Sequence, residues 1–279
     1  MIFPSNAHTH STFCDGISTL EEMVSMAEQK QFVSLGFTGH AGQGFDEAYS
    51  MMSGRQEAYF EGIKALQKKT SLKLYAGLEL DIKAYPEWIK KAEETAEYII
   101  ASNHYAVEVD ENGVSIAYDG EPIALKNYVN KHKDGDGLSL ANQYFQEVVD
   151  AVLKLKPDII GHFDLIRKHA KPLNLFDEND IAYKKLASEM LEKLGKSGAI
   201  LEVNTGGMAR GYLNLPYPTY ELLAQWKEMG GEITLTSDCH LAKNLTFAFE
   251  EVLSQIKKLG YKQVLYLGNG NSLWESYSL

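Results

Sequence analysis

Cysteine is scarce in this sequence: only Cys14 and Cys239 occur among its 279 residues. So few cysteines cannot form the disulfide framework of a small secreted protein and are typical of the reducing cytoplasm. No apolar run approaches the ~20 residues that a membrane-spanning helix requires. Residues 1–6 also lack the charged and apolar regions of a signal peptide. We therefore expect a cytoplasmic protein with no membrane partner.

Positive charge is scarce as well, because 27 Lys and Arg residues stand against 38 Asp and Glu residues. The resulting formal net charge of −11 argues against nucleic acid or an anionic membrane as the main partner. An acidic protein that binds an anionic substrate needs a local positive centre, such as bound metal. The chain contains no internal repeat, low-complexity tract or linker, so we expect one domain over residues 1–279. Its oligomeric state stays open between a monomer and a small homo-oligomer.

Short apolar runs alternate with longer amphipathic segments along the chain. We predict strands over residues 33–38, 72–78, 98–102, 158–161, 199–204, 232–237 and 263–267. We predict helices over residues 54–68, 86–96, 139–155, 178–195, 219–229 and 246–259, and another that opens at the capping box 18–21. Such alternation implies parallel strands, and seven or eight units in this length favour a closed barrel over an open sheet. Residues 105–137 lack the pattern, so we expect a lid or an active-site loop there.

Residues of the types that bind metals follow the predicted strands. His8 and His10 are two positions apart, so in a strand their side chains share one face and can bind the same ion. Asp238 and His240 have the same spacing after a later strand. In a parallel barrel these strand ends meet at one rim, where functional residues gather. The predicted ligands are His8, His10, Asp15, His40, Glu79, His104, His162, Asp238 and His240.

The number of candidate ligands indicates the kind of centre. Nine groups are too many for one tetrahedral site, so two or three ions are needed. Imidazole and carboxylate ligands suit Zn, Fe or Mn. Each residue alone would more often be a hydrogen-bonded core group, and it is their recurrence at strand ends that favours metal. We expect Cys14 and Cys239 to be small buried fillers, and we do not expect His132 or His169 to be ligands.

The charge of the predicted centre favours an anionic substrate. Three divalent ions would outweigh their carboxylate ligands and complement a phosphate dianion. Arg167, which follows His162 closely, is a candidate phosphate clamp, and Arg210 is a second candidate. Either arginine could instead form a structural or surface ion pair. The sequence has no Gly-rich loop of the GxxxxGK type, so use of a nucleoside triphosphate is not indicated.

Several motifs occur in order at the predicted strand ends: His8-Thr9-His10-Ser11 with Asp15-Gly16, Phe37-Thr38-Gly39-His40, Gly77-Leu78-Glu79-Leu80-Asp81, Ser102-Asn103-His104, Gly161-His162-Phe163-Asp164-Leu165-Ile166-Arg167, Leu201-Glu202-Val203-Asn204-Thr205 and Ser237-Asp238-Cys239-His240. Together they resemble the PHP phosphoesterases, and among these the histidinol-phosphate phosphatases. The resemblance runs nearly from end to end of the chain. Such an ordered set is far more specific than any one motif.

The resemblance implies a distorted, TIM-like (β/α)7 barrel with three divalent metal ions at the C-terminal ends of its strands. It also implies a role for each matching residue. His8, His10, Glu79 and Asp238 would hold one ion; Glu79 would bridge to a second, also held by His104 and His162; and Asp15, His40 and His240 would hold the third. Arg167 matches the family's phosphate-binding arginine, and Glu202, Asn204 and Arg210 match the stretch near the substrate. The candidate catalytic residues are Arg167, Asp15 and His240.

The resemblance further implies hydrolysis of L-histidinol phosphate to L-histidinol and phosphate, a step of histidine biosynthesis. We expect the ions to bind phosphoryl oxygens and to lower the pKa of an attacking water to roughly 7. The family usually has an acidic residue at Gly39 and Val or Ile at Asn103, and both positions flank ligands and bear on substrate fit. Another small phosphorylated metabolite is the alternative substrate. Further alternatives are an amidohydrolase-type enzyme that cleaves C–N bonds and a non-catalytic, metal-stabilised binding module.

Overall fold

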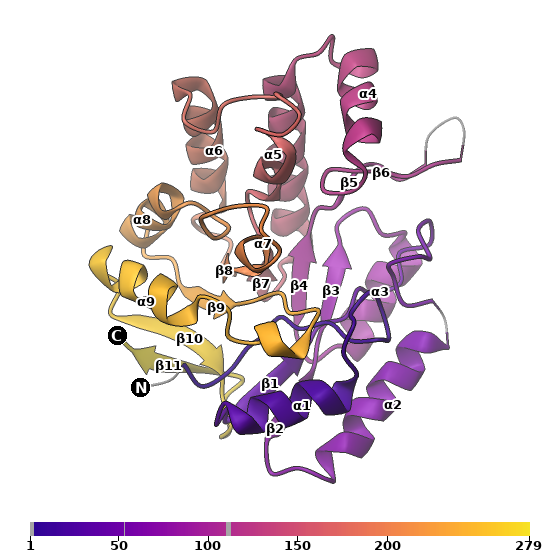
Figure 1. Cartoon of the computed structure of the whole chain (residues 1–279), viewed down its shortest axis with the longest axis vertical. Helices are drawn as coiled ribbons and strands as arrows, with labels where there is room; N and C mark the ends of the chain where they lie inside the picture. The colour runs from indigo at the N-terminus through magenta and orange to yellow at the C-terminus, as the bar shows by residue number, and fades with distance from the viewer. Residues whose placement is uncertain (1–2, 53, 110–112) are drawn as a thin grey trace.

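One mixed sheet of seven strands, covered by helices, occupies the middle of this computed structural model (Figure 1). The structure describes residues 3–52, 54–109 and 113–279. Neighbouring strands are parallel, except that the last two pair antiparallel. The predicted α/β class is therefore confirmed. The strand order is β11 (Trp274–Ser278), β10 (Gln263–Leu267), β9 (Ile233–Thr236), β8 (Ile200–Asn204), β7 (Ile159–Ile160), β4 (Ile99–Ser102) and β3 (Leu78–Asp81).

The remaining strands form two small sheets. β1 (Ser34–Phe37) pairs in parallel with β2 (Lys73–Ala76), and β5 (Tyr105–Val107) pairs antiparallel with β6 (Ile116–Ala117). Only Gly77 separates β2 from β3, so the chain passes directly from the small parallel sheet into the large one. A Cβ atom at Gly77 would lie 2.7 Å from the ring of Tyr98, so this close approach requires glycine.

The segment 4–10 is hydrogen-bonded along both of its edges. On one side, the amide of Gly36 donates to the carbonyl of Asn6 at 2.9 Å. On the other side, the amide of His10 donates to the carbonyl of Cys239, also at 2.9 Å. The segment therefore lies between β1 and the residues that follow β9, and it carries the first histidine pair to that position.

The helices begin at local sequence signals. At the start of α1 (Leu20–Gln29), the Thr19 hydroxyl accepts from the amide of Glu22 at 3.2 Å, and the Glu22 carboxylate accepts from the amide of Thr19 at 2.9 Å. The capping box thus begins one residue later than predicted. No helix of the described residues is long and apolar enough to cross a membrane. The other helices are α2 (Arg55–Gln67), α3 (Pro86–Thr95), α4 (Pro122–His132), α5 (Gly137–Leu155), α6 (Ile181–Leu194), α7 (Gly206–Ala209), α8 (Tyr220–Glu228) and α9 (Phe249–Lys258), with short 3-10 helices η1 (Leu165–His169) and η2 (Ala242–Asn244).

The segment 105–137, predicted as an irregular lid or active-site loop, contains regular structure, and its residues 117 and 119–122 line the cavity described below. The hairpin of β5 and β6 opens it, and α4 follows. Pro122 stands in the first turn of α4, and the Asp136 side chain caps α5. Only Leu125 and Val129 are buried on α4, and so narrow an apolar stripe gives little periodicity in the sequence. Residues 110–112 lie outside the described part of the chain.

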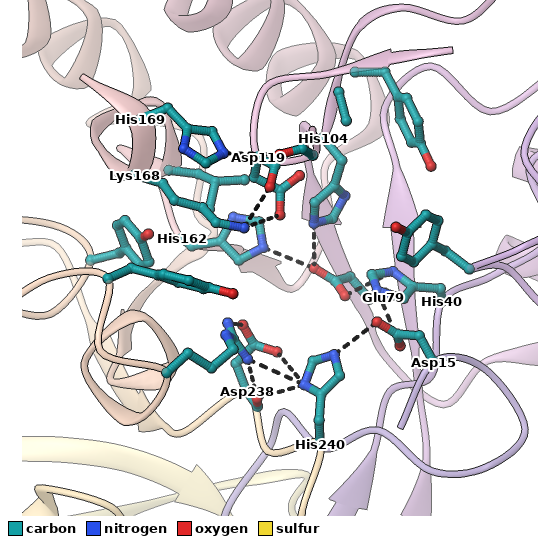
Figure 2. A pocket seen from close by; sticks show the side chains of 18 of the residues that line it. Asp15, His40, Glu79, His104, Asp119, His162, Lys168, His169, Asp238 and His240 are labelled. Carbon is teal, nitrogen blue, oxygen red and sulfur yellow. Dashed lines mark hydrogen bonds and ion pairs between the residues drawn. The ribbon is translucent and has the colours of Figure 1, made fainter. Parts of the chain in front are cut away.

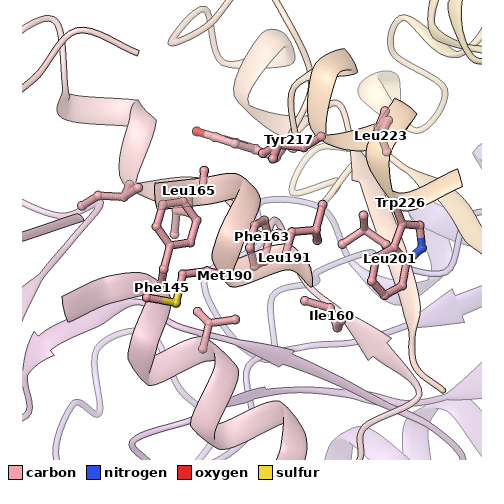
Figure 3. Close-up of a cluster of buried hydrophobic side chains, with 14 of the residues drawn as sticks. Phe145, Ile160, Phe163, Leu165, Met190, Leu191, Leu201, Tyr217, Leu223 and Trp226 are labelled. Atoms are coloured by element: carbon pink, nitrogen blue, oxygen red, sulfur yellow. The ribbon is translucent and has the colours of Figure 1, made fainter. Parts of the chain in front are cut away.

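The larger hydrophobic core lies between the sheet and α5, α6 and α8 (Figure 3). Each of these elements contributes fully or almost fully buried side chains to it. A second cluster packs α1 and α2 against β1. Helices therefore pack against both the large sheet and the small parallel sheet. Figure 3 labels Phe145, Ile160, Leu191, Leu201 and Trp226 among the members of the larger core.

We expect Leu191→Ala on α6 to lower the free energy of unfolding by about 2–5 kcal/mol, because it leaves a cavity among buried side chains. Leu153→Ala on α5 is the matched control: Leu153 is 47% exposed, and this change is expected to cost within about 0.5 kcal/mol. Urea unfolding followed by circular dichroism measures both. Equal losses would contradict the assignment of the inner face of α6.

Candidate functional site

All nine predicted ligands lie together at one end of the sheets, and Figure 2 shows seven of them around a cavity. Parallel strands that end at one level deliver their following residues to the same place. The ligands come from the N-terminal segment (His8 and His10), the turn after it (Asp15), β3 itself (Glu79), and the residues that follow β1 (His40), β4 (His104), β7 (His162) and β9 (Asp238 and His240).

Glu79 is the residue on which these side chains converge. Its Oε2 lies 3.3 Å from Nε2 of His8 and 3.3 Å from Nε2 of His10. The same oxygen lies 3.1 Å from Nδ1 of His40. Although burial opposes ionisation of Glu79, the imidazoles of His40 and His8 hold its pKa well below its usual range. The carboxylate is therefore charged and can serve as a ligand.

The other oxygen of Glu79 faces a different pair of imidazoles. Its Oε1 lies 3.0 Å from Nε2 of His162 and 3.5 Å from Nε2 of His104. Behind His104, the carboxylate of Asp81 accepts from the backbone amide at 2.9 Å and lies 3.2 Å from Nδ1. Asp81 thus fixes the orientation of this ring, as carboxylates behind metal-binding histidines commonly do. One carboxylate therefore stands between two groups of nitrogen atoms.

Asp15 is the centre of a third group. Its Oδ2 lies 3.0 Å from Nε2 of His240. Its Oδ1 lies 3.5 Å from Nδ1 of His10 and 3.6 Å from Nε2 of His40, and this buried oxygen has no hydrogen-bond partner among the described residues. A buried carboxylate oxygen surrounded by imidazole nitrogens is suited to bind a cation.

Asp238 completes the first group and also holds an arginine. Its Oδ1 lies 3.3 Å from Nε2 of His10 and 3.8 Å from Nε2 of His8. Its Oδ2 accepts from the Arg210 guanidinium at 2.8 Å. Arg210 also donates to the backbone carbonyl of Asp238 at 3.1 Å. The predicted phosphate contact Arg210 is therefore at the site, bound to a candidate ligand.

The spacing of these atoms fits divalent cations. Ligand atoms about 2.0–2.2 Å from one tetrahedral ion lie roughly 3.3–3.6 Å from one another. Around Glu79 Oε2, the nitrogens of His8 and His10 are 3.1 Å apart and lie 3.3 Å from the oxygen. Ligand atoms fall within 4.8 Å of one another in three overlapping sets: His8, His10 and Glu79; His40, Glu79 and His104; and His10, Asp15, His40 and His240.

Glu202 lies behind the candidate ligands and does not line the cavity in front of them. It is fully buried, and its Oε1 lies 2.5 Å from Nδ1 of His8. The Glu202 carboxylate also accepts hydrogen bonds from the hydroxyl of Thr236 at 2.7 Å, the amide of His162 at 2.6 Å and the side chain of Asn204 at 3.1 Å. Asn204 is also fully buried. Both residues were expected near the substrate, but their hydrogen bonds direct them inward to hold His8 and the end of β8.

A cavity of about 580 Å³ opens in front of the ligands. Seven of the nine predicted ligands line it, and the segment 117–122 and the residues after β7 form the facing side. Its lining thus combines candidate metal ligands with charged and aromatic groups. Among the residues not singled out in the sequence are Gln43, Tyr49, Tyr105, Asp119, Lys168, Tyr212 and Tyr217.

Lys168 is the cationic group of the facing side (Figure 2). Its Nζ donates to the backbone carbonyl of Asp119 at 2.5 Å and to the carboxylate at 3.3 Å. The ammonium also lies 4.4 Å from the centre of the Tyr212 ring. Although burial opposes ionisation of Asp119, Lys168 holds its pKa below the usual range. Lys168 could have been inferred from its place in the residues that follow a predicted ligand strand.

Arg167 points away from this cavity, contrary to the predicted phosphate clamp. Its side chain is 1% exposed, and its Nε donates to Glu178 at 2.5 Å. Its NH1 donates to Asp164 at 3.2 Å and to the carbonyl of Pro216 at 3.1 Å. Successive residues of a 3-10 helix such as η1 point about 120° apart, so Arg167 and Lys168 face different sides. Arg167 instead lines a separate cavity of about 670 Å³ beside α6 and α8.

Asn103 and Gly39, the two positions that depart from the family pattern, have surroundings that suit the residues found there. Asn103 is buried, and its amide donates to the carboxylate of Glu147 on α5 at 3.1 Å. A Cβ atom at Gly39 would lie 3.1 Å from Met51 and 3.2 Å from Cys14, so these side chains occupy the adjacent space. Neither residue lines the cavity in front of the ligands.

The cysteines and the two other histidines take varied positions. Cys239 is buried, and its thiol donates to the carbonyl of Leu241 at 3.1 Å. Cys14 is only half-buried, and its Sγ lies 3.4 Å from Nδ1 of His10. His132 ends α4, whereas His169 lines the cavity with its Nε2 3.0 Å from a backbone carbonyl. Among the described residues, neither histidine belongs to a ligand set.

Several known proteins resemble this chain in sequence and in fold. The family model described as the PHP domain matches residues 6–206. The histidinol-phosphatase of Bacillus subtilis (strain 168) is 24% identical over 275 residues, which cover 90% of this chain and 98% of that protein. The structure of histidinol phosphate phosphatase from Lactococcus lactis, complexed with zinc, L-histidinol and phosphate, superposes with a TM-score of 0.70 at 23% identity and covers 94% of this chain and 96% of that one. A Listeria monocytogenes structure gives a TM-score of 0.73 at 19% identity, covering 88% and 99%. At these identities the solved structures show a shared fold.

We expect Glu202→Gln to weaken zinc binding about 10- to 100-fold, because the neutral amide no longer orients and polarises the ring of His8. Glu192→Gln is the matched control, since Glu192 is exposed on α6. Competition with a chromophoric chelator measures the affinity of each protein. An unchanged affinity in Glu202→Gln would contradict this role.

Proposed function

This chain belongs to the PHP domain family, and from that premise we propose that it is a metal-dependent phosphatase that hydrolyses L-histidinol phosphate to L-histidinol and phosphate. Relatives from Bacillus subtilis and Lactococcus lactis bear the name of this activity. The observation that carries the proposal is the position of Glu79. Its oxygens face separate groups of imidazoles at the wall of a cavity that Lys168 and Arg210 also line.

We propose that the site binds three divalent cations, for which zinc suits the imidazole and carboxylate ligands. Such ions supply positive charge to the phosphoryl oxygens and lower the pKa of a bound water to roughly 7. Glu79 is suited to connect two of these cation sites, because its two carboxylate oxygens have different imidazole neighbours. The proposed sets are His8, His10, Glu79 and Asp238; Glu79, His104 and His162; and Asp15, His40 and His240.

The chain's own charged groups would orient the substrate in the cavity. The Lys168 ammonium and the Arg210 guanidinium offset the charge of the phosphoryl group from the protein side. L-histidinol phosphate also carries a cationic amine, and the carboxylate of Asp119 on the facing side complements it. Asp15 and His240 line the same cavity and remain the candidates for contact with the reacting group.

The exposure of the ligands supports an enzyme over a purely structural metal site. A structural site encloses its ions, whereas a catalytic site keeps a position open to substrate. Here seven of the nine proposed ligands line the cavity, and only His8 and His10 do not. A non-catalytic binding module would not need its ligands to face such a space.

We also propose that the strands close into a distorted seven-stranded barrel within a single domain. The large sheet provides a continuous run from β3 to β9. The segment 4–10 is bonded to β1 on one side and to the residues after β9 on the other, and His40 forms a parallel bridge with Glu79. These bonds support a ring made of segment 4–10, β1, β2 with β3, β4, β7, β8 and β9.

We expect purified protein loaded with zinc to release phosphate from L-histidinol phosphate, and chelation followed by dialysis to abolish this release. Metal content is measured in parallel by plasma emission spectrometry, so that activity is tied to occupancy. Re-addition of zinc should restore the release of phosphate. No release at any loading with zinc, manganese or iron would refute the phosphatase proposal. If the protein releases phosphate only from another phosphorylated metabolite, the proposed substrate is refuted and the proposed type of reaction is retained.

We expect Lys168→Met to lower kcat/KM about 10- to 100-fold, because a charge-assisted hydrogen bond to the phosphoryl group contributes about 1.5–3 kcal/mol. Lys171→Met is the matched control, since Lys171 is exposed a few residues further on and does not line the cavity. Steady-state kinetics on L-histidinol phosphate decides between them. Equal kcat/KM values of the two variants would contradict a contact between Lys168 and the substrate.

A further inference from the structure

Tyr217 is a buried tyrosine at the cavity whose hydroxyl has no hydrogen-bond partner among the described residues. It is 1% exposed, and its ring centroid lies 6.3 Å from that of His162. Figure 3 shows it at the edge of the larger hydrophobic core. Buried hydroxyl groups almost always have a partner, so an unsatisfied one beside a cavity requires an explanation.

The backbone of Tyr217 is fixed by the end of β8. The amide of Asn204 donates to the carbonyl of Tyr217 at 2.7 Å, and the amide of Tyr217 donates back at 2.9 Å. The Asn204 side chain in turn accepts from the amide of Gly206 at 2.7 Å. Asn204 therefore connects the tyrosine to the same rigid strand end that carries Glu202.

The ring of Tyr217 is confined on one side by α7. A Cβ atom at Gly207 would lie 2.8 Å from Cε2 and 3.1 Å from the hydroxyl oxygen of Tyr217. Any side chain at Gly207 would therefore displace the ring and its hydroxyl. The glycine therefore lets α7 approach the ring directly.

Arg167 confines the same residue from another side. Its guanidinium carbon lies 6.0 Å from the centre of the Tyr217 ring, and its NH1 donates to the carbonyl of Pro216 at 3.1 Å. Asp164, the partner of Arg167, accepts from the amide of Thr219 at 3.1 Å. The ion pair thus holds the chain immediately before and after Tyr217. This accounts for an arginine that is buried away from the cavity.

We propose that the Tyr217 hydroxyl is a substrate-contacting group that donates a hydrogen bond to a phosphoryl oxygen, and that Arg167 and Asn204 are positioning residues for it. This inference rests on the proposed phosphatase function. The backbone of Tyr217 is fixed by Asn204, α7 and Arg167 lie beside its ring, and no described residue pairs with its hydroxyl, so the hydrogen-bonding capacity of the hydroxyl is kept for a bound ligand. Burial raises the pKa of Tyr217, so the hydroxyl stays protonated and remains a donor.

The test is Tyr217→Phe in the zinc-loaded full chain, with Tyr183→Phe as the matched control. Tyr183 is also buried with an unpartnered hydroxyl, but it lines the separate cavity beside α6 and α8. We expect Tyr217→Phe to lower kcat/KM on L-histidinol phosphate about 10- to 100-fold. Zinc content and Tm should stay unchanged, because no protein contact of the hydroxyl is lost. Tyr183→Phe should match the parent chain in every measurement.

Binding of inorganic phosphate separates this inference from the proposed function. Calorimetric titration of zinc-loaded protein with phosphate needs no turnover, and Tyr217→Phe should raise the Kd about 10- to 100-fold. If the parent chain hydrolyses no L-histidinol phosphate, the function fails and this titration still decides the role of Tyr217. An unchanged Kd in Tyr217→Phe would overturn the inference.

Arg167→Lys tests the positioning role. It keeps the charge but cannot make all the contacts of the guanidinium with Glu178, Asp164 and Pro216. We expect a smaller loss of kcat/KM than in Tyr217→Phe, and no further loss when the two changes are combined, because a positioning residue acts through the hydroxyl. Fully additive losses would show that Arg167 acts independently of Tyr217.

Discussion

The site depends on one carboxylate, that of Glu79, which is buried among five imidazoles. Three of these rings face one of its oxygens and two face the other, so a single side chain connects the separate groups. Such a concentration of nitrogen and oxygen ligands can be assembled only if several strands end at the same level. Parallel pairing provides that, because every strand then runs in one direction and delivers its following residue to the same rim. The parallel arrangement of the sheet therefore brings the candidate ligands together as well as forming the apolar core.

A layer of buried acceptors keeps the ligands in place. Asp81 holds His104 and Glu202 holds His8, so each ring presents its other nitrogen to the centre. Glu202 also connects β8 to the amide of His162, which ties neighbouring strands together at the level of the ligands. Burying these charges costs free energy, and the cost is offset because Asp81 and Glu202 each have several hydrogen-bond partners. The same layer extends through Asn204 to Tyr217, so ligands and cavity wall share one rigid support.

The nearness of the ligands could be predicted because it follows from local rules: side-chain alternation places His8 with His10, and strand ends place His162 beside Glu79. Arg167 was predicted as the phosphate clamp, but the structure places Lys168 at the cavity instead, since a 3-10 turn rotates consecutive side chains and no local pattern says which faces inward. Glu202 illustrates a second limit. Whether an acid at the end of a strand faces substrate or supports a ligand depends on partners such as Thr236, which are distant in sequence. Likewise α4 was missed because only a narrow stripe of it is buried.

The position of segment 4–10 has a consequence for how the molecule is made. Asn6 donates to the hydroxyl of Ser237 at 2.6 Å and to the carbonyl of Leu245 at 3.0 Å, so contacts near one terminus need residues more than two hundred positions later. During translation the first histidine pair is made well before β9, so its contacts with the residues after β9 cannot form until those residues have emerged. Contacts of such long sequence separation form late in folding. A nascent chain can therefore bring its candidate ligands together only after β9 and the residues that follow it have been synthesised.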